Sequence, residues 1–138
     1  MDARKFLQQI EKIELQIKNK KYEKERWDDI ATSITAQMGG ERVQTSGSKE
    51  KMAKAVIEAV AVQEQIDVLL DTISEVYRVI EKLDTKYYKF IHKIYVQGMT
   101  LREVASSEGY SYSWATTMHS RALKEVQRIL DGEKKRRC

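Results

Sequence analysis

The sequence predicts an all-α protein, and three observations predict it. None of the 138 residues is proline, the residue that most often breaks a helix. The six glycines leave long stretches without a helix breaker. Across those stretches, apolar residues recur at spacings of three and four, which is the periodicity of one helix face. Together these features favour long packed helices over a sandwich or a barrel.

The first helix is expected over residues 3–38. Its apolar stripe begins with four side chains at helical spacing and resumes at Trp27. The stripe is weak and basic over residues 18–24, so a break near residues 19–21 is allowed. Gly39 and Gly40 should end the helix, and a loop rich in turn formers follows over residues 39–48. The first four stripe residues are Phe6, Ile10, Ile13 and Ile17.

A second helix is expected over residues 49–82, with Ser48 as its N-cap and Glu50 in its first turn. Its predicted seam keeps a spacing of three and four over about four heptads, which is typical of a coiled coil. The two long helices can fold back as an antiparallel hairpin. The same stripes can instead pair residues 3–38 and 49–82 between two chains as a homodimer, and the periodicity does not choose. The seam is Met52, Val56, Ala59, Gln63, Ile66, Leu70, Ile73, Tyr77 and Ile80.

A third helix is expected over residues 84–97, capped by Asp84 and stopped by Gly98. Its apolar face is rich in aromatic side chains. Residues 1–83 are therefore predicted to form a long helical arm for oligomerisation or partner contact, and residues 84–131 a separate domain. Residues 132–138 form a basic tail after Gly132. The apolar face of the third helix holds Tyr87, Tyr88, Ile91, Ile94 and Tyr95.

The strongest local pattern begins at Thr100. Thr100 and Glu103 have the spacing of a capping box, in which each side chain reaches a backbone amide of the other residue. A short helix should follow, with Leu101, Val104 and Ala105 on its buried side. Gly109 then supplies the open backbone angle that a turn between two helices requires. The spacing predicts a helix-turn-helix.

The next helix is expected from about Tyr112 to Leu130, capped by Ser111 or Ser113. Its core face repeats at helical spacing: Ala115, Met118, Ala122, Val126 and Ile129. In a helix-turn-helix, the first residues of the second helix enter the major groove of DNA. Short polar side chains and arginine can bond base edges there, and cations further along contact phosphates. The candidate DNA-binding residues are Arg102, Tyr112, Ser113, Thr116, Thr117, Ser120, Arg121, Lys124 and Arg128.

The positive charge gathers in the C-terminal third. Residues 84–138 hold 11 basic and six acidic side chains, against nine and eight in residues 1–48 and five and seven in residues 49–83. A localised basic excess is the pattern expected of a protein that binds a polyanion such as DNA. A solvated charged surface explains the charge alone about as well. The basic run Lys134–Arg137 would add non-specific affinity for DNA or remain a solvated tail.

Several classes of function find no support in the residues. Cys138 is the one cysteine and there are two histidines, so no zinc spacing and no intramolecular disulfide arise. No nucleophile, phosphate-binding loop or metalloprotease motif is present. The chain is therefore expected to be neither an enzyme nor a cofactor- or metal-binding protein. No apolar run is long enough to cross a membrane, and no signal peptide begins the chain, so a cytoplasmic location is expected.

Two side chains of the predicted recognition helix are ambiguous. His119 lies beside the core face, where packing or a hydrogen bond is favoured over contact with DNA. Trp114 can pack on the third helix or lie near the DNA backbone. Aromatic residues at helical spacing usually belong to a core, so packing is favoured.

Three runs in this region form a family-like pattern: Leu101-Arg-Glu-Val-Ala105, Gly109-Tyr-Ser111 and Ser120-Arg-Ala-Leu-Lys124. They resemble region 4 of sigma-70-type factors, the promoter-reading region of bacterial sigma factors. Most of residues 5–130 also resembles short phage-encoded proteins related to the RinA and ArpU late-transcription regulators. That wider resemblance rests on the ATSIT segment Ala31–Thr35, the VQTSGS run Val43–Ser48 and the H-x-x-AL run His119–Leu123.

The resemblance implies a regulator of phage or prophage transcription that binds double-stranded DNA and contacts RNA polymerase. One departure matters. Sigma region 4 usually recognises its element with charged residues, but Ser113, Thr116 and Thr117 occupy the matching positions here. The target sequence does not follow from the family. Nothing resembles sigma region 2, so promoter melting is not expected.

Two other functions fit the same residues. A small terminase subunit, which takes part in phage DNA packaging, also joins a DNA-binding helical domain to long oligomerising helices, and it should form a large ring. A helical adaptor would use residues 1–83 to bind a protein partner, and its basic end would be incidental. The adaptor predicts no salt-dependent affinity for DNA.

Overall fold

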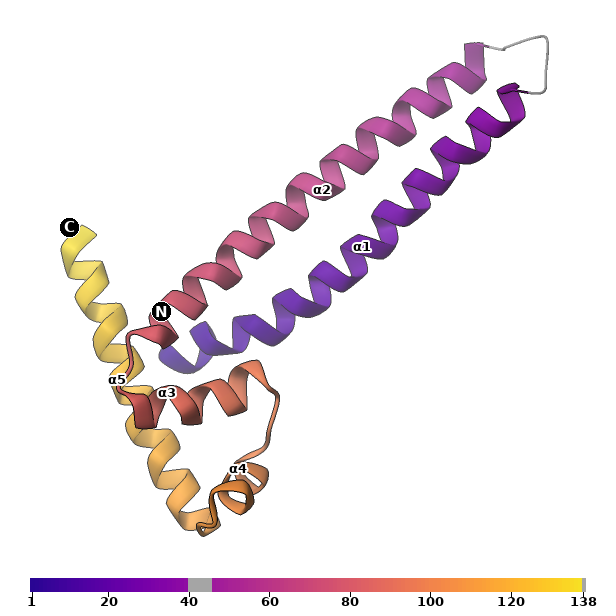
Figure 1. The fold of residues 1–138 in the computed structure, drawn as a ribbon. Coiled ribbons are helices and arrows are strands. Elements are labelled where there is room, and N and C mark those ends of the chain that lie inside the picture. The colour runs from indigo at the N-terminus through magenta and orange to yellow at the C-terminus, as the bar shows by residue number, and fades with distance from the viewer. Residues whose placement is uncertain (40–45, 138) are drawn as a thin grey trace. The chain divides into compact units, whose positions relative to one another are not determined.

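The computed structural model describes residues 1–39 and 46–137, and Figure 1 shows their helices. Every regular element in these ranges is helical, which confirms the predicted all-α fold. A helical hairpin comes first and a helix-turn-helix arrangement follows. The elements are α1 (Ala3–Gly39), α2 (Ser46–Glu81), α3 (Thr85–Ile91), the π-helical turn η1 (His92–Val96), α4 (Leu101–Glu108) and α5 (Tyr112–Arg137).

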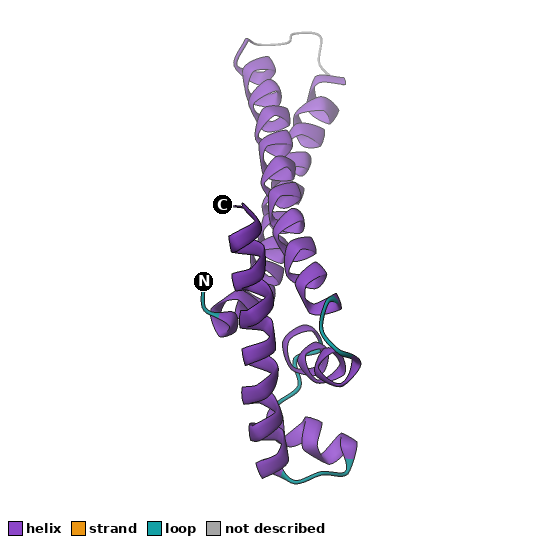
Figure 2. Ribbon diagram, turned by 90° about the vertical axis from the view of Figure 1, so that its left-hand side faces the viewer, coloured by secondary structure: helices purple, strands orange, loops and turns teal. Residues whose placement is uncertain are grey.

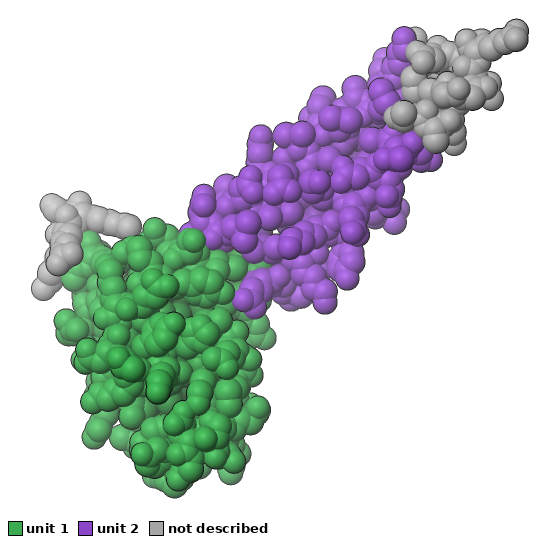
Figure 3. Space-filling model, in the orientation of Figure 1, with its two compact units in different colours: residues 1–13, 72–138 green, residues 14–71 purple. Residues whose placement is uncertain are grey.

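The chain divides into two compact units, coloured separately in Figure 3. Unit 1 joins Met1–Ile13 to Thr72–Cys138, and unit 2 is Glu14–Asp71. Unit 1 therefore contains both ends of the predicted arm together with the helix-turn-helix. The predicted boundary at residues 83–84 does not coincide with this division, and that two-part organisation stays a prediction.

Within unit 2, α1 and α2 lie side by side in one chain (Figures 1 and 2). α1 continues without a break through Asn19–Lys21 and ends at Gly39, as predicted. The predicted seam of α2 is partly wrong, because Val56 and Leu70 are 51% and 49% exposed. Apolar residues occupy adjacent positions along α2, so two stripes fit the periodicity, and the hairpin uses the stripe with smaller residues. Its buried members on α2 in this unit are Ala55, Ala59, Val62 and Ile66.

The start of α2 also differs from the prediction. α2 begins at Ser46, so Ser48 lies inside the helix and not at its N-cap, and no acidic residue lies in the first turn. Gly47 is tolerated there because the first turn of a helix makes few internal hydrogen bonds. The predicted loop residues 40–45, which include Gly40, lie outside the described residues.

The core of unit 1 draws on all five α-helices. Leu7 and Ile10 of α1 are fully buried, whereas Phe6, which the periodicity favoured, is only half-buried. One cluster joins these α1 side chains to buried residues of α2, α3, α4 and α5. The first turns of the chain are thus part of the same core as the helix-turn-helix. The largest fully buried partners are Val76, Val79, Ile80, Ile91, Val104 and Val126.

The predicted third helix changes its winding halfway. α3 passes into η1, where the Gln97 amide donates to the His92 carbonyl at 3.0 Å. Gly98, with φ of 76°, then stops the helix as predicted. Asp84 precedes α3, but its side chain makes no capping hydrogen bond, so that prediction is wrong. Leu83, the residue before Asp84, is buried in the core of unit 1.

The predicted tail is a continuation of α5. The helix runs through Gly132 to Arg137, and Cys138 lies outside the described residues. Glu133 accepts hydrogen bonds from Arg78 at 2.9 Å and from Lys82 at 2.6 Å, and both donors belong to the α2 end of unit 1. These bonds, that of Lys82 foremost, lower the pKa of the Glu133 carboxyl. They stabilise the helical turn around Gly132, where glycine would otherwise favour an end to the helix.

Candidate DNA-binding site

The first helix of the helix-turn-helix has one of the two bonds of the predicted capping box. The Thr100 hydroxyl oxygen accepts the Glu103 amide at 3.2 Å. The Glu103 carboxylate lies 3.1 Å from the same hydroxyl and accepts its proton, so it does not reach back to the Thr100 amide. Val104 and Ala105 are buried and Leu101 is half-buried, which fixes the inner side of α4.

The turn between α4 and α5 has the conformation that the sequence predicts. Gly109 adopts φ of 74°, the left-handed region that glycine enters without strain. The Tyr110 amide donates to the Ala105 carbonyl at 2.9 Å and closes the turn. The Ser111 hydroxyl then accepts the Trp114 amide at 3.1 Å, so Ser111 and not Ser113 caps α5. Local hydrogen bonds therefore set where α5 begins.

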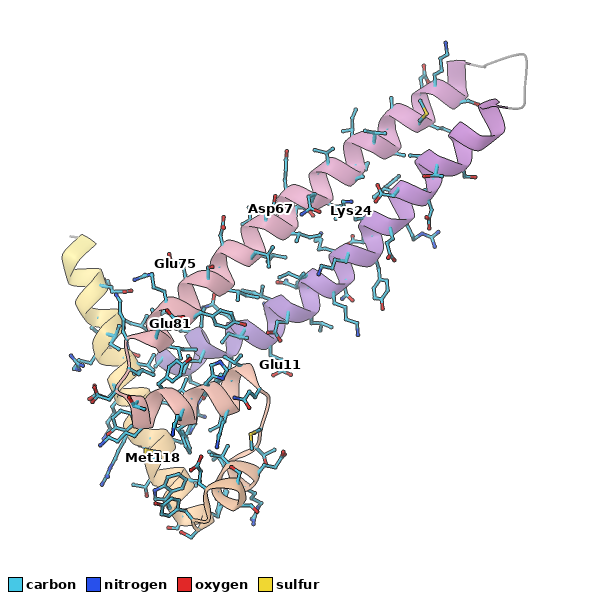
Figure 4. All side chains as sticks on the ribbon, viewed as in Figure 1. Glu11, Lys24, Asp67, Glu75, Glu81 and Met118 are labelled. Carbon is cyan, nitrogen blue, oxygen red and sulfur yellow. The ribbon has the colours of Figure 1, made fainter. Side chains whose placement is uncertain are left out.

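α5 separates a core face from a polar face. Ala115, Ala122 and Val126 are fully buried, and Met118, labelled in Figure 4, lies half-buried on the α5 stretch that packs on α3. Ile129 is also half-buried, so the predicted core face is confirmed. All nine predicted DNA-binding side chains are exposed. Eight of them project from α5 and Arg102 projects from α4.

The exposed face is polar at its start and cationic further along. The Thr116 hydroxyl donates to the Ser113 carbonyl at 2.8 Å, which orients its methyl group and its lone pairs. The Arg102 guanidinium lies 4.5 Å from the centre of the Tyr112 ring, a cation–π contact that holds Arg102 beside the start of α5. The structure thus brings Arg102 and Tyr112 together, although they belong to different helices.

The three cations at the far end of this face differ in their surroundings. Arg128 donates twice to the Glu125 carboxylate, at 3.1 and 3.0 Å, so part of its charge is already neutralised. Arg121 and Lys124 make no ion pair within the described part of the chain. Of these three cations, they are therefore the two best placed to contact an external anion.

Trp114 packs inside the domain. Its ring meets Phe90 of α3 edge-on at 5.7 Å and stacks on Tyr110 at 4.4 Å. The prediction that Trp114 packs on the third helix is confirmed. The Tyr110 stack was not predicted, because no spacing pattern in the sequence marks Tyr110. An ion pair between Lys93 and Glu108 also joins the π-helical turn to the end of α4.

His119 supports the domain from inside. Its Nε2 lies 2.7 Å from the Tyr95 hydroxyl, and the two rings stack at 5.9 Å. The predicted packing and hydrogen-bonding role is therefore confirmed. Burial, helped by the nearby charge of Arg4, lowers the pKa of the His119 imidazole. His92 has a separate partner, the Gln97 side chain at 2.9 Å.

This lowered pKa predicts a pH dependence of stability. Below the ordinary value of 6.5 the unfolded chain binds a proton at His119 more readily than the folded chain does. The free energy of unfolding should therefore fall as pH decreases through this range, and it should have its full value above the range. Urea denaturation at about pH 7.5 and about pH 5.5 would measure the decrease. The variant His119→Gln should flatten the profile and His92→Gln should keep it. An unchanged profile in His119→Gln would assign the effect to another group.

One cation near this site was not predicted from the sequence. Arg4, in the first turn of α1, lines a groove with residues of α5. More than a hundred positions separate Arg4 from α5, and no local pattern links them. The one available hint was that Ala3 and Leu7 extend the helical stripe of the first helix towards its start.

Within the described ranges, no three acidic, histidine or cysteine side chains lie close enough to hold a metal ion. No helix in those ranges is long and apolar enough to span a membrane.

Comparison with known proteins shows a sigma-factor-like region in the chain. Over 61 residues it is 31% identical to a protein of Bacillus subtilis (strain 168) described as RNA polymerase sigma factor SigO. The match covers 44% of this chain, which spans 35% of the length of that curated relative. No protein-family model matches the chain, and no solved structure resembles it significantly. The chain therefore shares part of its sequence with a bacterial sigma factor.

Proposed function

We propose that the protein is a sequence-specific DNA-binding transcription regulator that reads DNA with α5. The observation that carries the proposal is the capped helix-turn-helix, whose second helix presents a face of mainly polar and cationic exposed side chains. The sigma-factor likeness supports it, because sigma factors act on promoter DNA with RNA polymerase. We further propose contact with RNA polymerase, a phage or prophage origin, a cytoplasmic location and no enzymatic activity.

Each part of the face has its own role in this proposal. Ser113, Thr116 and Thr117 lie in the first two turns of α5, the part of a recognition helix that reaches base edges. The Ser113 and Thr117 hydroxyls donate to or accept from bases, the Thr116 hydroxyl accepts because its proton goes to the Ser113 carbonyl, and the threonine methyl groups contact thymine. Arg121 and Lys124 follow and contact phosphates, which fixes the register of the helix on DNA. Arg102, held over Tyr112, adds a phosphate contact from α4.

DNA binding measured by fluorescence anisotropy tests the proposal. The probes are a random duplex of about 30 base pairs and a duplex from upstream of the protein's own gene, each across a salt series. The upstream duplex should bind at least about tenfold more tightly than the random one. Thr117→Ala should reduce this preference, and Arg121→Ala should weaken binding to both duplexes.

Exposed residues of the same types in unit 2 give matched controls. Thr32→Ala and Arg26→Ala, both on α1, should leave both affinities unchanged. If neither duplex binds at low salt, the proposal fails and residues 1–83 become the part to test for protein partners, as in an adaptor. If the variants on α5 bind like the wild type, the reading face is placed wrongly.

We also propose that residues 1–83 mediate self-association. The observation that favours it is a group of exposed apolar side chains on α2, which an isolated hairpin would leave in water. Sedimentation of the protein on its duplex distinguishes the alternatives. Two chains per complex support a homodimer, one chain removes it, and a large ring supports the terminase-like alternative. These exposed apolar side chains include Val56, Ile57, Val60 and Leu70.

A further inference from the structure

The first turn of α1 is bonded to the middle of α5, inside unit 1. The Ala3 amide donates to the Gln127 side-chain oxygen at 2.8 Å, and the Gln127 side-chain nitrogen donates to the Met1 carbonyl at 3.2 Å. Ala3 is 3% exposed against this helix. Figure 2 shows the start of α1 beside α5. The position of residues 1–4 is therefore fixed by the recognition helix itself.

A groove of about 480 Å³ lies where these segments meet. Arg4 lines it from α1, Ser120 and Lys124 line it from α5, and Leu101 closes it at the start of α4. Two cations and a hydroxyl from different helices thus face one open space. Ser120 and Lys124 also belong to the exposed face that is proposed to meet DNA, so the groove continues that face towards the N-terminus of the chain.

The charge of the groove is positive. Neither Arg4 nor Lys124 has an ion-pair partner within the described residues. Asp2 also lines the groove, but its carboxylate accepts the Arg4 amide at 3.1 Å and is held by its own backbone. The charge of Arg4 reaches the groove wall, where it contributes to the lowered pKa of His119. Two cations and one carboxylate give the groove a net positive charge, which suits an anion.

We propose that this groove binds a backbone phosphate of the DNA, with Arg4 and Lys124 contacting it from two helices. The inference rests on the proposed DNA-binding function and extends the interface to the first turn of the chain. The first helix of a helix-turn-helix crosses the DNA backbone, and Leu101, at the start of that helix, lines the groove. A guanidinium can donate two parallel hydrogen bonds to one phosphate, so Arg4 anchors the register without reading sequence.

The salt dependence of DNA binding tests this assignment. For each phosphate that the protein no longer neutralises, the slope of log affinity against log salt should become less steep by about 0.9. Arg4→Ala should show this change on both the random and the upstream duplex, with the ratio of the two affinities unchanged. Arg4→Lys keeps the charge and should restore the slope. Lys12→Ala removes an exposed cation from the same helix, two turns further on, and should leave the slope unchanged.

The outcomes separate this inference from the function on which it rests. If Arg121→Ala lowers the slope but Arg4→Ala does not, DNA binding stands and the groove assignment is overturned. If the wild-type protein shows no salt-dependent binding, the proposed function fails first. In a Trp27→Phe background, Trp114 fluorescence and the melting temperature should be the same with and without Arg4→Ala, because the bonds of residues 1–3 to Gln127 do not use the Arg4 side chain. A reduced slope together with altered fluorescence would count against a direct contact.

Discussion

Replacing Leu7 with alanine should lower the free energy of unfolding of unit 1 by about 2–5 kcal/mol. Leu7 is fully buried in the cluster that α1 shares with α2, α3, α4 and α5. Its removal would leave a cavity between the first turns of the chain and the core of the helix-turn-helix. Because the cluster spans helices far apart in sequence, the loss should appear as unfolding of the DNA-binding region and not only of α1.

Leu15→Ala is the matched control, since it makes the same chemical change on the same helix at a side chain that is 59% exposed. It should change the free energy of unfolding by less than about 0.5 kcal/mol. Both variants would be made in a Trp27→Phe background, which leaves Trp114 to report on the helix-turn-helix. Urea denaturation followed by Trp114 fluorescence gives the two values. Equal values would show that α1 contributes little to the stability of unit 1.

The helix-turn-helix could be predicted closely because its signals are local. The capping pair Thr100 and Glu103, Gly109 in the turn and Ser111 before α5 each fix the backbone within about one turn of helix. The core face of α5 followed from periodicity alone, and its opposite face gave eight of the nine candidate DNA-binding residues, all of which are exposed. Contact between these residues and DNA remains a prediction, whereas their placement on one face of α5 is observed.

Features set by distant contacts could not be predicted in the same way. The seam of α2 was misassigned at Val56 and Leu70 because two apolar stripes share that helix, and only the packing of α1 selects one. Gly132 predicts a helix end locally, but Glu133 is held by Arg78 of α2 and by Lys82, the residue that follows α2. The groove around Arg4 likewise depends on contacts across the whole chain. Sequence patterns describe single elements, and these features arise between elements.

A change in the packing of α4 against α5 should have the second large effect, because this packing positions the exposed face of α5 that is proposed to read DNA. Ala105 is 3% exposed and Ala115 is fully buried, and both belong to the core of unit 1. Side chains this small allow two helices to approach closely. Ala105→Leu inserts three carbon atoms into this filled space and should lower the free energy of unfolding by about 1–3 kcal/mol. It should also reduce the preference for upstream DNA, since α5 must shift away from α4 to make room.

Ser106 is the neighbour of Ala105 in sequence, but it is exposed. Ser106→Leu is therefore the matched control, because it adds a leucine to α4 without filling the core. It should keep both the stability and the preference for upstream DNA. Urea denaturation and anisotropy on the two duplexes measure both properties for each variant. A stable Ala105→Leu that keeps full preference would show that α5 can read DNA without a fixed contact to α4. Loss of the preference for upstream DNA with retained helical content would instead show that DNA reading requires a fixed position of α5. The turn at Gly109 and the small residues on α4 provide that fixed position.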